Sequence, residues 1–311
     1  MSFGSAVQTL LAIFTSDILP IFLIAGCGFL LARHSSLDVR SIARVIFNVL
    51  APCMVFSLVV GSTVPIFEFG RMALFAILVT ATVGIASFVA ARSLGLDRPS
   101  LIGFVLVGMF SNNGNYGLPV ALFAFGREAL TMAAVYFVTS AILLYTVGVF
   151  LAASGRRSVR QAIRGVTRVP TIYAVGVAVI VLALGVSVPT AVMRPVSLLS
   201  DASLPMMILV LGMQLERAAW PERPAAVATA AALSLFFAPI VAIALAFALG
   251  LSGPAFQAGV IEASMPAAVV TTIIALEFEV APGFVTSVVF LTTILSPFTL
   301  TGLIAWLQRA G

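Results

Sequence analysis

The most concentrated group of polar side chains lies inside an otherwise apolar stretch, residues 101–125. It holds three amides, two glycines and a proline in the run Ser111-Asn112-Asn113-Gly114-Asn115-Tyr116-Gly117-Leu118-Pro119. Amide N–H groups donate hydrogen bonds to anions, and amide oxygens accept hydrogen bonds or bind cations. In hydrocarbon, each unpaired backbone or amide group costs several kcal/mol, so a lipid-facing helix cannot carry this run. We expect it to face protein or a cavity and to bind a ligand there.

Four polar residues each stand four positions before a proline. The pairs are Asn48 and Pro52, Asn115 and Pro119, Asp201 and Pro205, and Glu262 and Pro266. Because proline has no N–H, the carbonyl four residues before it loses its helical partner and is free to bind an ion, water or a side chain. At Pro119 and Pro266 the interruption predicts two half-helices, whose second halves begin at these prolines with positive N-terminal ends. At Pro52 and Pro205 a simple kink is the alternative explanation.

Two acidic residues within apolar segments are candidates for binding a cation. Glu262 is the stronger one, because a carboxylate inside a membrane span is costly and by default functional, although a structural hydrogen bond is the alternative. Asp201 lies nearer the end of its segment, where capping or pairing is the alternative role. Oxygen ligands suit a hard cation such as sodium, and a proton fits these residues equally well. Asp17 is expected to cap the first apolar segment, and no other metal or cofactor is predicted.

The composition places these residues in a membrane. Hydrophobic residues make up 61% of the 311 residues and charged residues 9%, with a mean hydropathy of +1.20, which excludes a soluble domain of this size. Ten apolar segments approach the roughly 20 residues that cross a bilayer, near 13–32, 42–60, 70–91, 101–125, 130–152, 171–187, 196–213, 226–250, 255–275 and 284–307. The predicted fold is therefore an all-α polytopic membrane protein with ten transmembrane helices.

The distribution of arginine predicts how the chain is oriented, since the chain has no lysine and short cytoplasmic loops are enriched in basic residues. If both termini lie outside, all but four of the 16 arginines fall on the inner side; the four are Arg71, Arg127, Arg194 and Arg309. The basic segment 156–168 is then cytoplasmic, and its charge needs no nucleic-acid partner. Arginine instead of lysine, with abundant alanine and valine, suggests a GC-rich bacterial genome and hence the cytoplasmic membrane.

Proline landmarks recur in the same order in the two halves of the chain. Pro20 corresponds to Pro170, Pro52 to Pro205, and Pro119 to Pro266. We predict a first five-helix repeat over 1–153, a basic connector over 154–169 and a second repeat over 170–311. An odd number of spans per repeat makes the second repeat inverted in the membrane.

Hydroxyl residues in corresponding regions of the two repeats are weaker candidates for the site, because hydroxyls often bond their own helix. They are Thr139, Ser140, Thr292, Thr293 and Ser296.

The polar run at 111–119 resembles the signature of the auxin efflux carrier family, which includes plant auxin exporters and bacterial permeases for dicarboxylates. Ala263-Ser264-Met265-Pro266 is similar to the second-half counterpart of that signature, and residues 292–300 are similar to the last-span pattern. Leu204-Pro205, followed by residues 211–215, agrees as well. The resemblance therefore covers nearly the whole chain.

This resemblance implies two inverted five-helix repeats, with broken helices 4 and 9 that cross near the membrane midplane at Pro119 and Pro266. It also implies that substrate binds at the crossing, between a scaffold part and a part that moves relative to it. The predicted substrate-binding residues are Asn112, Asn113, Asn115, Tyr116, Gly117, Pro119, Ser264, Met265 and Pro266. The long hydrophilic central loop of the plant exporters is missing here, which argues against auxin itself.

The sequence thus predicts a secondary transporter for a small organic anion, a carboxylate or dicarboxylate, that works by alternating access, with sodium or a proton as the coupling ion if transport is coupled. No arginine is predicted in the hydrocarbon core, so amides and half-helix N-termini would hold the anion. The alternatives are a bile-acid-type sodium symporter, a channel and an intramembrane protease. The predicted partners are the organic anion and membrane lipid; a homodimer stays open, because the residues indicate no dimer face.

Overall fold

The computed structural model describes residues 3–153, 169–216 and 223–310, and these residues form helices with a single isolated β-bridge. In this described part, seven helical segments are long and apolar enough to cross a membrane: Val7–His34, Val39–Val60, Ile66–Ser93, Asn113–Ala152, Thr190–Leu215, Pro224–Ala248 and Pro282–Ala310. Two shorter apolar helices are Arg98–Met109 and Pro170–Leu184. The all-helical membrane fold predicted from composition is confirmed at this level.

The chain begins with three long helical segments. The first comprises α1 (Phe3–Ile13), the π-helical turn η1 (Phe14–Ile18) and α2 (Leu19–His34); the second comprises α3 (Val39–Val45), η2 (Ile46–Leu50) and α4 (Ala51–Val60); the third is α5 (Ile66–Ser93). The expected cap at Asp17 is wrong. Because no proline interrupts residues 3–16, the helix starts at Phe3, and Asp17 lies buried in η1, where it accepts a hydrogen bond from Ser16 Oγ at 2.6 Å.

The polar run interrupts the next part of the chain. α6 (Arg98–Met109) ends before it, and η3 (Asn113–Gly117) leads into α7 (Leu118–Leu143), η4 (Leu144–Gly148) and α8 (Val149–Ala152). α7 breaks at Gly126, where φ is 84° and ψ is −167°, a backbone conformation that suits glycine. The long segment Asn113–Ala152 therefore contains the second half of the predicted fourth span and all of the fifth.

The second half of the chain repeats this alternation of long and interrupted helices. Its elements are α10 (Pro170–Leu184), α11 (Thr190–Leu215), α12 (Pro224–Ala232), η5 (Leu233–Phe237), α13 (Ala238–Ala248), α14 (Gly253–Ala263), α15 (Val270–Phe278) and α16 (Pro282–Ala310). The predicted ninth span corresponds to α14 and α15 with an irregular segment between them. The predicted connector 154–169 lies outside the described residues except for Val169.

Four of the five described π-helical turns end two residues before a proline: Pro20, Pro52, Pro119 and Pro239. In each, the residue before the proline donates its N–H to the carbonyl five residues back, for example Leu118 N–H to Asn113 O. Proline cannot donate in the next position, so the turn widens to take one extra residue. At Pro52, where a simple kink is the alternative explanation from the sequence, the helix contains the π-helical turn η2.

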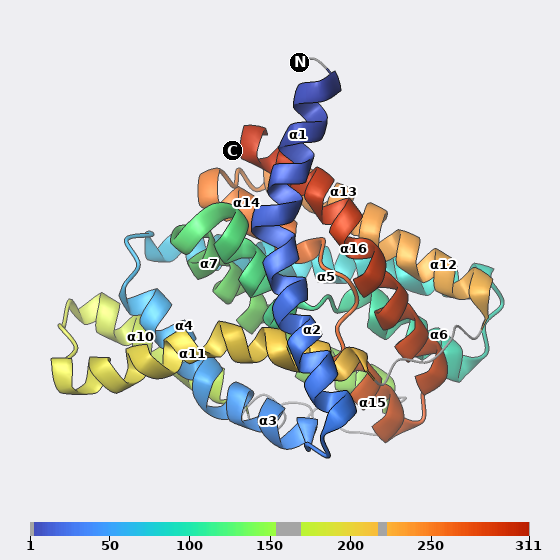
Figure 1. The fold of residues 1–311 in the computed structure, drawn as a ribbon, viewed down its shortest axis with the longest axis horizontal. Helices are drawn as coiled ribbons and strands as arrows, with labels where there is room; N and C mark the ends of the chain where they lie inside the picture. The colour runs from blue at the N-terminus through green and yellow to red at the C-terminus, as the bar shows by residue number, and fades with distance from the viewer. Residues whose placement is uncertain (1–2, 154–168, 217–222, 311) are drawn as a thin grey trace.

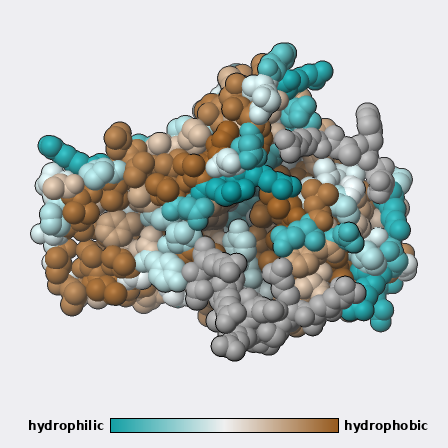
Figure 2. Space-filling model, turned by 90° about the horizontal axis from the view of Figure 1, so that it is seen from below, coloured by the Kyte–Doolittle hydropathy of each residue, from teal (hydrophilic) through white to brown (hydrophobic). Residues whose placement is uncertain are grey.

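Helices α2 and α11 pack with their backbones in direct contact. A Cβ on Gly212 would overlap the carbonyl of Ala25, and one on Gly28 would overlap the carbonyl of Leu209. In Figure 1, the N- and C-terminal ends lie at one end of the molecule and α3 and α15 at the other. Seen from the α3 end, hydrophilic residues cross the middle of the surface, and hydrophobic residues cover the part on the left (Figure 2). α3 and α15 therefore mark the end of the molecule opposite the two termini.

Candidate functional site

The two interrupted helices meet at their interruptions. Ser111 and Ala267 form the antiparallel β-bridge, in which Asn112 N–H donates to Pro266 O at 2.7 Å and Ala268 N–H donates to Phe110 O at 2.8 Å. This pairing uses only the carbonyl of Pro266, so its missing N–H costs nothing here. The bridge satisfies backbone groups that neither helix can satisfy in an apolar interior.

The second halves of both broken helices begin beside this bridge. η3 starts at Asn113 and α15 at Val270. The break in the first helix therefore precedes Asn113, whereas the sequence placed the start of the half-helix at Pro119; Pro119 instead follows the π-helical turn. The N-terminal end of each half-helix is positive and favours a negative charge. The N–H groups of Asn113, Thr271 and Thr272 already donate to the carbonyls of Ser111, Ala268 and Val269.

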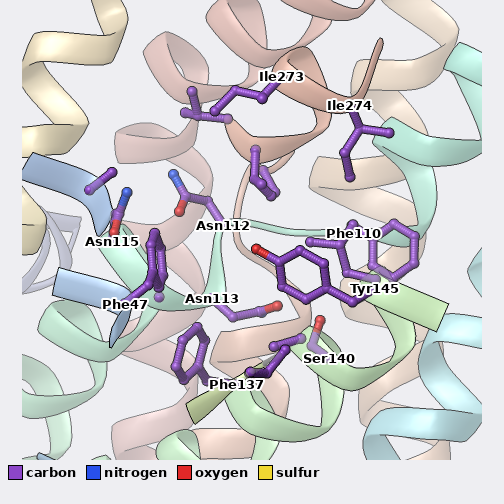
Figure 3. Close-up of a pocket in the computed structure, with 18 of the residues that line it drawn as sticks. Phe47, Phe110, Asn112, Asn113, Asn115, Phe137, Ser140, Tyr145, Ile273 and Ile274 are labelled. Carbon is purple, nitrogen blue, oxygen red and sulfur yellow. The ribbon is translucent and has the colours of Figure 1, made fainter. Parts of the chain in front are cut away.

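A cavity of about 540 Å³ lies next to the bridge. Asn112, Asn113 and Asn115 line one side of it, and Phe47 lies between Asn113 and Asn115 in Figure 3. Asn115 Nδ2 donates to Gln214 Oε1 at 3.4 Å. The buried Asn112 Nδ2 and Asn115 Oδ1 have no hydrogen-bond partner among the described residues. A buried unpaired amide is costly, so these two atoms are available to a ligand.

Phe110, Phe137, Ser140, Tyr145 and Ile273 form further parts of the cavity wall (Figure 3). Its lining is thus mostly apolar with a few polar groups, which is the usual character of a small-molecule site.

Glu262 lies behind the amide side of the cavity. Its side chain is fully buried, and neither carboxyl oxygen has a hydrogen-bond partner in the described part of the chain. Asn113, which does line the cavity, donates from Nδ2 to the backbone carbonyl of Glu262 at 2.8 Å. The carboxyl group lies against the backbone of Gly117, because a Cβ there would meet Glu262 Oε1 at 2.7 Å. Asn113 therefore connects the cavity wall with the buried acid.

Hydroxyl groups of α16 support the two interruptions from behind. Thr292 Oγ1 accepts a hydrogen bond from Ala267 N–H at 3.2 Å, and Ser296 Oγ donates to Tyr116 Oη at 3.2 Å. Ser140 lines the cavity, whereas the Thr139 and Thr293 hydroxyls donate to carbonyls of their own helices. The tenth predicted span thus contributes two hydroxyls that hold the site in place.

The predicted site residues fall into three groups. Asn112, Asn113 and Asn115 line the cavity. Asp201 is exposed on α11 and does not line it. The remaining residues are buried behind the cavity wall, around the bridge: Tyr116, Gly117, Pro119, Glu262, Ser264, Met265 and Pro266.

A stripe of side chains on α3 and η2 also lines the cavity, and the sequence reasoning did not select it. It consists of Arg40, Arg44, Phe47 and Asn48. Positions 40, 44, 47 and 48 fall on one face of a helix, so the sequence does contain a pattern that indicates a shared surface. The arginine count alone uses Arg40 and Arg44 only as markers of membrane orientation. Gln214, the partner of Asn115, was likewise missed as a site residue.

The sequence matches the family described as "Membrane transport protein" over residues 13–163 and 154–304. An "Uncharacterized transporter" of Methanothermobacter thermautotrophicus is 27% identical over 291 residues, which cover 91% of this chain and 94% of that protein. A protein of Rhizobium meliloti with the name "Putative malonate transporter" is 26% identical over 314 residues, which cover 96% of each chain. This chain is therefore a multi-pass integral membrane transporter rather than an enzyme, and it belongs to the Membrane transport protein family, the auxin efflux carrier family that its motifs resemble.

Proposed function

We propose that this chain is a secondary transporter that moves a small organic anion, a carboxylate or dicarboxylate, across the cytoplasmic membrane by alternating access. Ten spans would form two inverted five-helix repeats, with the broken fourth and ninth helices crossing near the membrane midplane. The two family matches, which divide the chain near its middle, support this plan. The β-bridge between the two interruptions supports a crossing at Ser111 and Ala267.

The observation that carries the proposal is the unpartnered amide in the cavity wall. Asn112 lines a cavity of about 540 Å³, and its buried Nδ2 is a hydrogen-bond donor with no acceptor among the described residues. The first turns of η3 and α15 lie beside it and favour negative charge. Together these donors suit a carboxylate. The name of the Rhizobium relative agrees with this class of substrate.

A buried acid next to the substrate site would link transport to a cation. Glu262 fills that position, and Asn113 connects it with the cavity. Sodium or a proton would bind at Glu262 and thereby change the hydrogen bonding of the amide wall. Asp201, predicted from sequence as a second acid of this site, lies exposed on α11 and would join only after the helices rearrange.

The mouth of the cavity indicates which side this conformation faces. Arg40, Arg44 and Glu277 line it, and they lie on α3 and α15, at the end of the molecule opposite the termini (Figure 1). With both termini outside, as the arginine distribution predicts, the cavity would open to the cytoplasm. The described conformation would then be the one that exchanges substrate with the cell interior.

Ligand-induced thermal stabilisation of the purified protein tests the proposal. A ligand that binds only the folded state raises its apparent stability by mass action. Small carboxylates, each tested with and without sodium and at two pH values, are expected to raise the melting temperature. Asn112→Ala is expected to weaken their binding about tenfold, the equivalent of one charge-assisted hydrogen bond.

Thr139→Ala is the matched control for this substitution. It removes a polar group of α7 that donates to Val135 O in its own helix at 2.9 Å and does not line the cavity, so carboxylate binding should persist. The absence of stabilisation by any small carboxylate would contradict the proposal. Stabilisation by steroid anions alone would favour a bile-acid-type symporter instead.

A further inference from the structure

Two arginines stand one helical turn apart at the mouth of the cavity. Arg40 and Arg44 on α3 both line it, and Phe47 and Asn48 continue the same stripe toward the asparagine amides. The Asn48 side chain lies along the same stripe, because its Nδ2 donates to the backbone carbonyl of Arg44, one turn earlier, at 2.8 Å. The cavity lining therefore contains both amide donors and guanidinium groups.

Like charges at positions i and i+4 of a helix disfavour each other. Neither of the ion pairs identified between described residues involves Arg40 or Arg44; those pairs are Arg71 with Glu68 and Arg223 with Asp97. A bound anion would offset the repulsion between the two guanidinium groups. Both arginines are exposed, so this repulsion is small, and negative charge bound between them would relieve it.

Asp38 directly precedes α3, which carries the arginine pair, and Glu277 on α15 lines the same cavity. Asp38 is already engaged, since it accepts hydrogen bonds from Ser41 Oγ at 2.6 Å and from the backbone N–H of Arg40 at 3.1 Å. The Ser41 hydrogen bond and the charge of Arg44 keep the pKa of Asp38 below its usual range. Glu277, the third charged residue of the cavity wall, has an interaction partner of its own. Neither acid forms an identified ion pair with Arg40 or Arg44.

We propose that Arg40 and Arg44 form a second anion-recognition point, and that the cavity therefore selects a dianion over a monoanion of the same length. One carboxylate binds at the Asn112 amide, and the other binds the guanidinium pair, whose planar forks match a carboxylate. The cavity, at about 540 Å³, has room for a ligand much larger than one carboxylate. This inference rests on the proposed function, because it assigns the selectivity of the same site.

Isothermal titration of the purified full-length protein with matched ligands tests this selectivity. Malonate, succinate, glutarate and adipate are compared with the monocarboxylates of equal chain length: propionate, butyrate, valerate and hexanoate. The unmodified protein is expected to bind its best dianion at least about tenfold more tightly than the matched monoanion. In the double variant Arg40→Gln/Arg44→Gln this preference should fall to within about twofold, while monoanion affinity stays nearly unchanged.

Arg33→Gln is the control for net charge. Arg33 lies at the end of α2, close to α3 in sequence, but does not line the cavity, so its variant should keep the dianion preference. The inference is overturned if the double variant keeps the preference, or if it weakens monoanions and dianions equally, as a general field effect would. Equal binding of both classes by the unmodified protein also overturns it and leaves the proposed function intact. Binding of neither class contradicts the proposed function itself.

Discussion

At the scale of single residues, the contact between Gly117 and Glu262 is the most constrained feature of the site. The carboxyl group lies where a side chain of residue 117 would begin, since a Cβ there would meet Glu262 Oε1 at 2.7 Å. A side chain at position 117 would therefore have to displace the carboxyl group of Glu262. The two residues come from the two halves of the chain, so this pair connects the broken helices through side-chain volume as well as through the backbone bridge.

Two substitutions at this contact test whether Glu262 couples transport to a cation. Glu262→Gln keeps the shape and removes the charge, so uptake by cells or proteoliposomes should lose its sodium or pH dependence while the protein still inserts. Gly117→Ala should displace the carboxyl group, lower the ion-dependent uptake and destabilise the protein by about 1–3 kcal/mol, the usual cost of overpacking. Both effects are measured by uptake at varied sodium and pH and by the melting temperature.

Gly70→Ala serves as the control for glycine replacement. Gly70 lies in α5, and a Cβ there meets nothing within 4 Å, so alanine should leave stability unchanged or raise it by up to about 1 kcal/mol. If Glu262→Gln retains the ion dependence of the parent protein, the coupling group lies elsewhere in the chain.

At the scale of the elements, the crossing of α2 with α11 brings two backbones together without side chains between them. Gly28 faces the backbone of Leu209, and Gly212 faces the backbone of Ala25. Small residues permit such close approach in membranes, where van der Waals packing replaces the hydrophobic effect as the driving force for helix association. α2 belongs to the predicted first repeat and α11 to the predicted second, so this close contact joins the two predicted repeats and we expect the two helices to move together.

Alanine at Gly212 is expected to separate these two helices. The added Cβ overlaps a backbone carbonyl, which cannot rotate away as a side chain can, so the loss should reach about 3 kcal/mol or more. The melting temperature and the monodispersity of the variant in detergent measure this effect. Gly26→Ala on the same α2 is the matched control, because a Cβ there meets nothing within 4 Å; equal stability of the two variants would refute the close crossing.

The sequence predicted the helical elements and the polar run better than it predicted the contacts between distant parts of the chain. Local composition was sufficient to select the run 111–119, whose three asparagines line the cavity. The same reasoning misplaced the break at Pro119, because a proline pattern does not distinguish a π-helical turn from a true interruption. The bridge between Ser111 and Ala267 and the pairing of Asn115 with Gln214 join distant parts of the chain. No local pattern encodes such contacts.

At the scale of the whole molecule, both termini lie at one end, and α3 and α15, which carry the charged residues of the cavity lining, lie at the other (Figure 1). A chain that starts and ends on the same side crosses the membrane an even number of times. This agrees with the ten spans that we propose, although seven described segments alone meet the length and composition of a full span. The remaining crossings would use the short helices α6 and α10 and the broken pair α14 and α15.

Labelling of single cysteines in intact cells tests the orientation. In a variant whose native Cys27 and Cys53 are replaced by serine, Ala310→Cys should react with a membrane-impermeant maleimide from outside. Ser36→Cys, at the exposed turn between α2 and α3, should react only after the cells are permeabilised. The reverse pattern would show that the termini are cytoplasmic and that the described cavity opens outward.

The π-helical turn η2 affects where the arginine stripe points. A π-helical turn contains one residue more than the helix around it needs, and one residue of an α-helix corresponds to a rotation of about 100°. The extra residue therefore turns the face that carries Arg40 and Arg44 by roughly a quarter turn about the helix axis, compared with a regular α-helix that continued from α4. Pro52 thus controls the direction of two charges that lie two to three turns away from it.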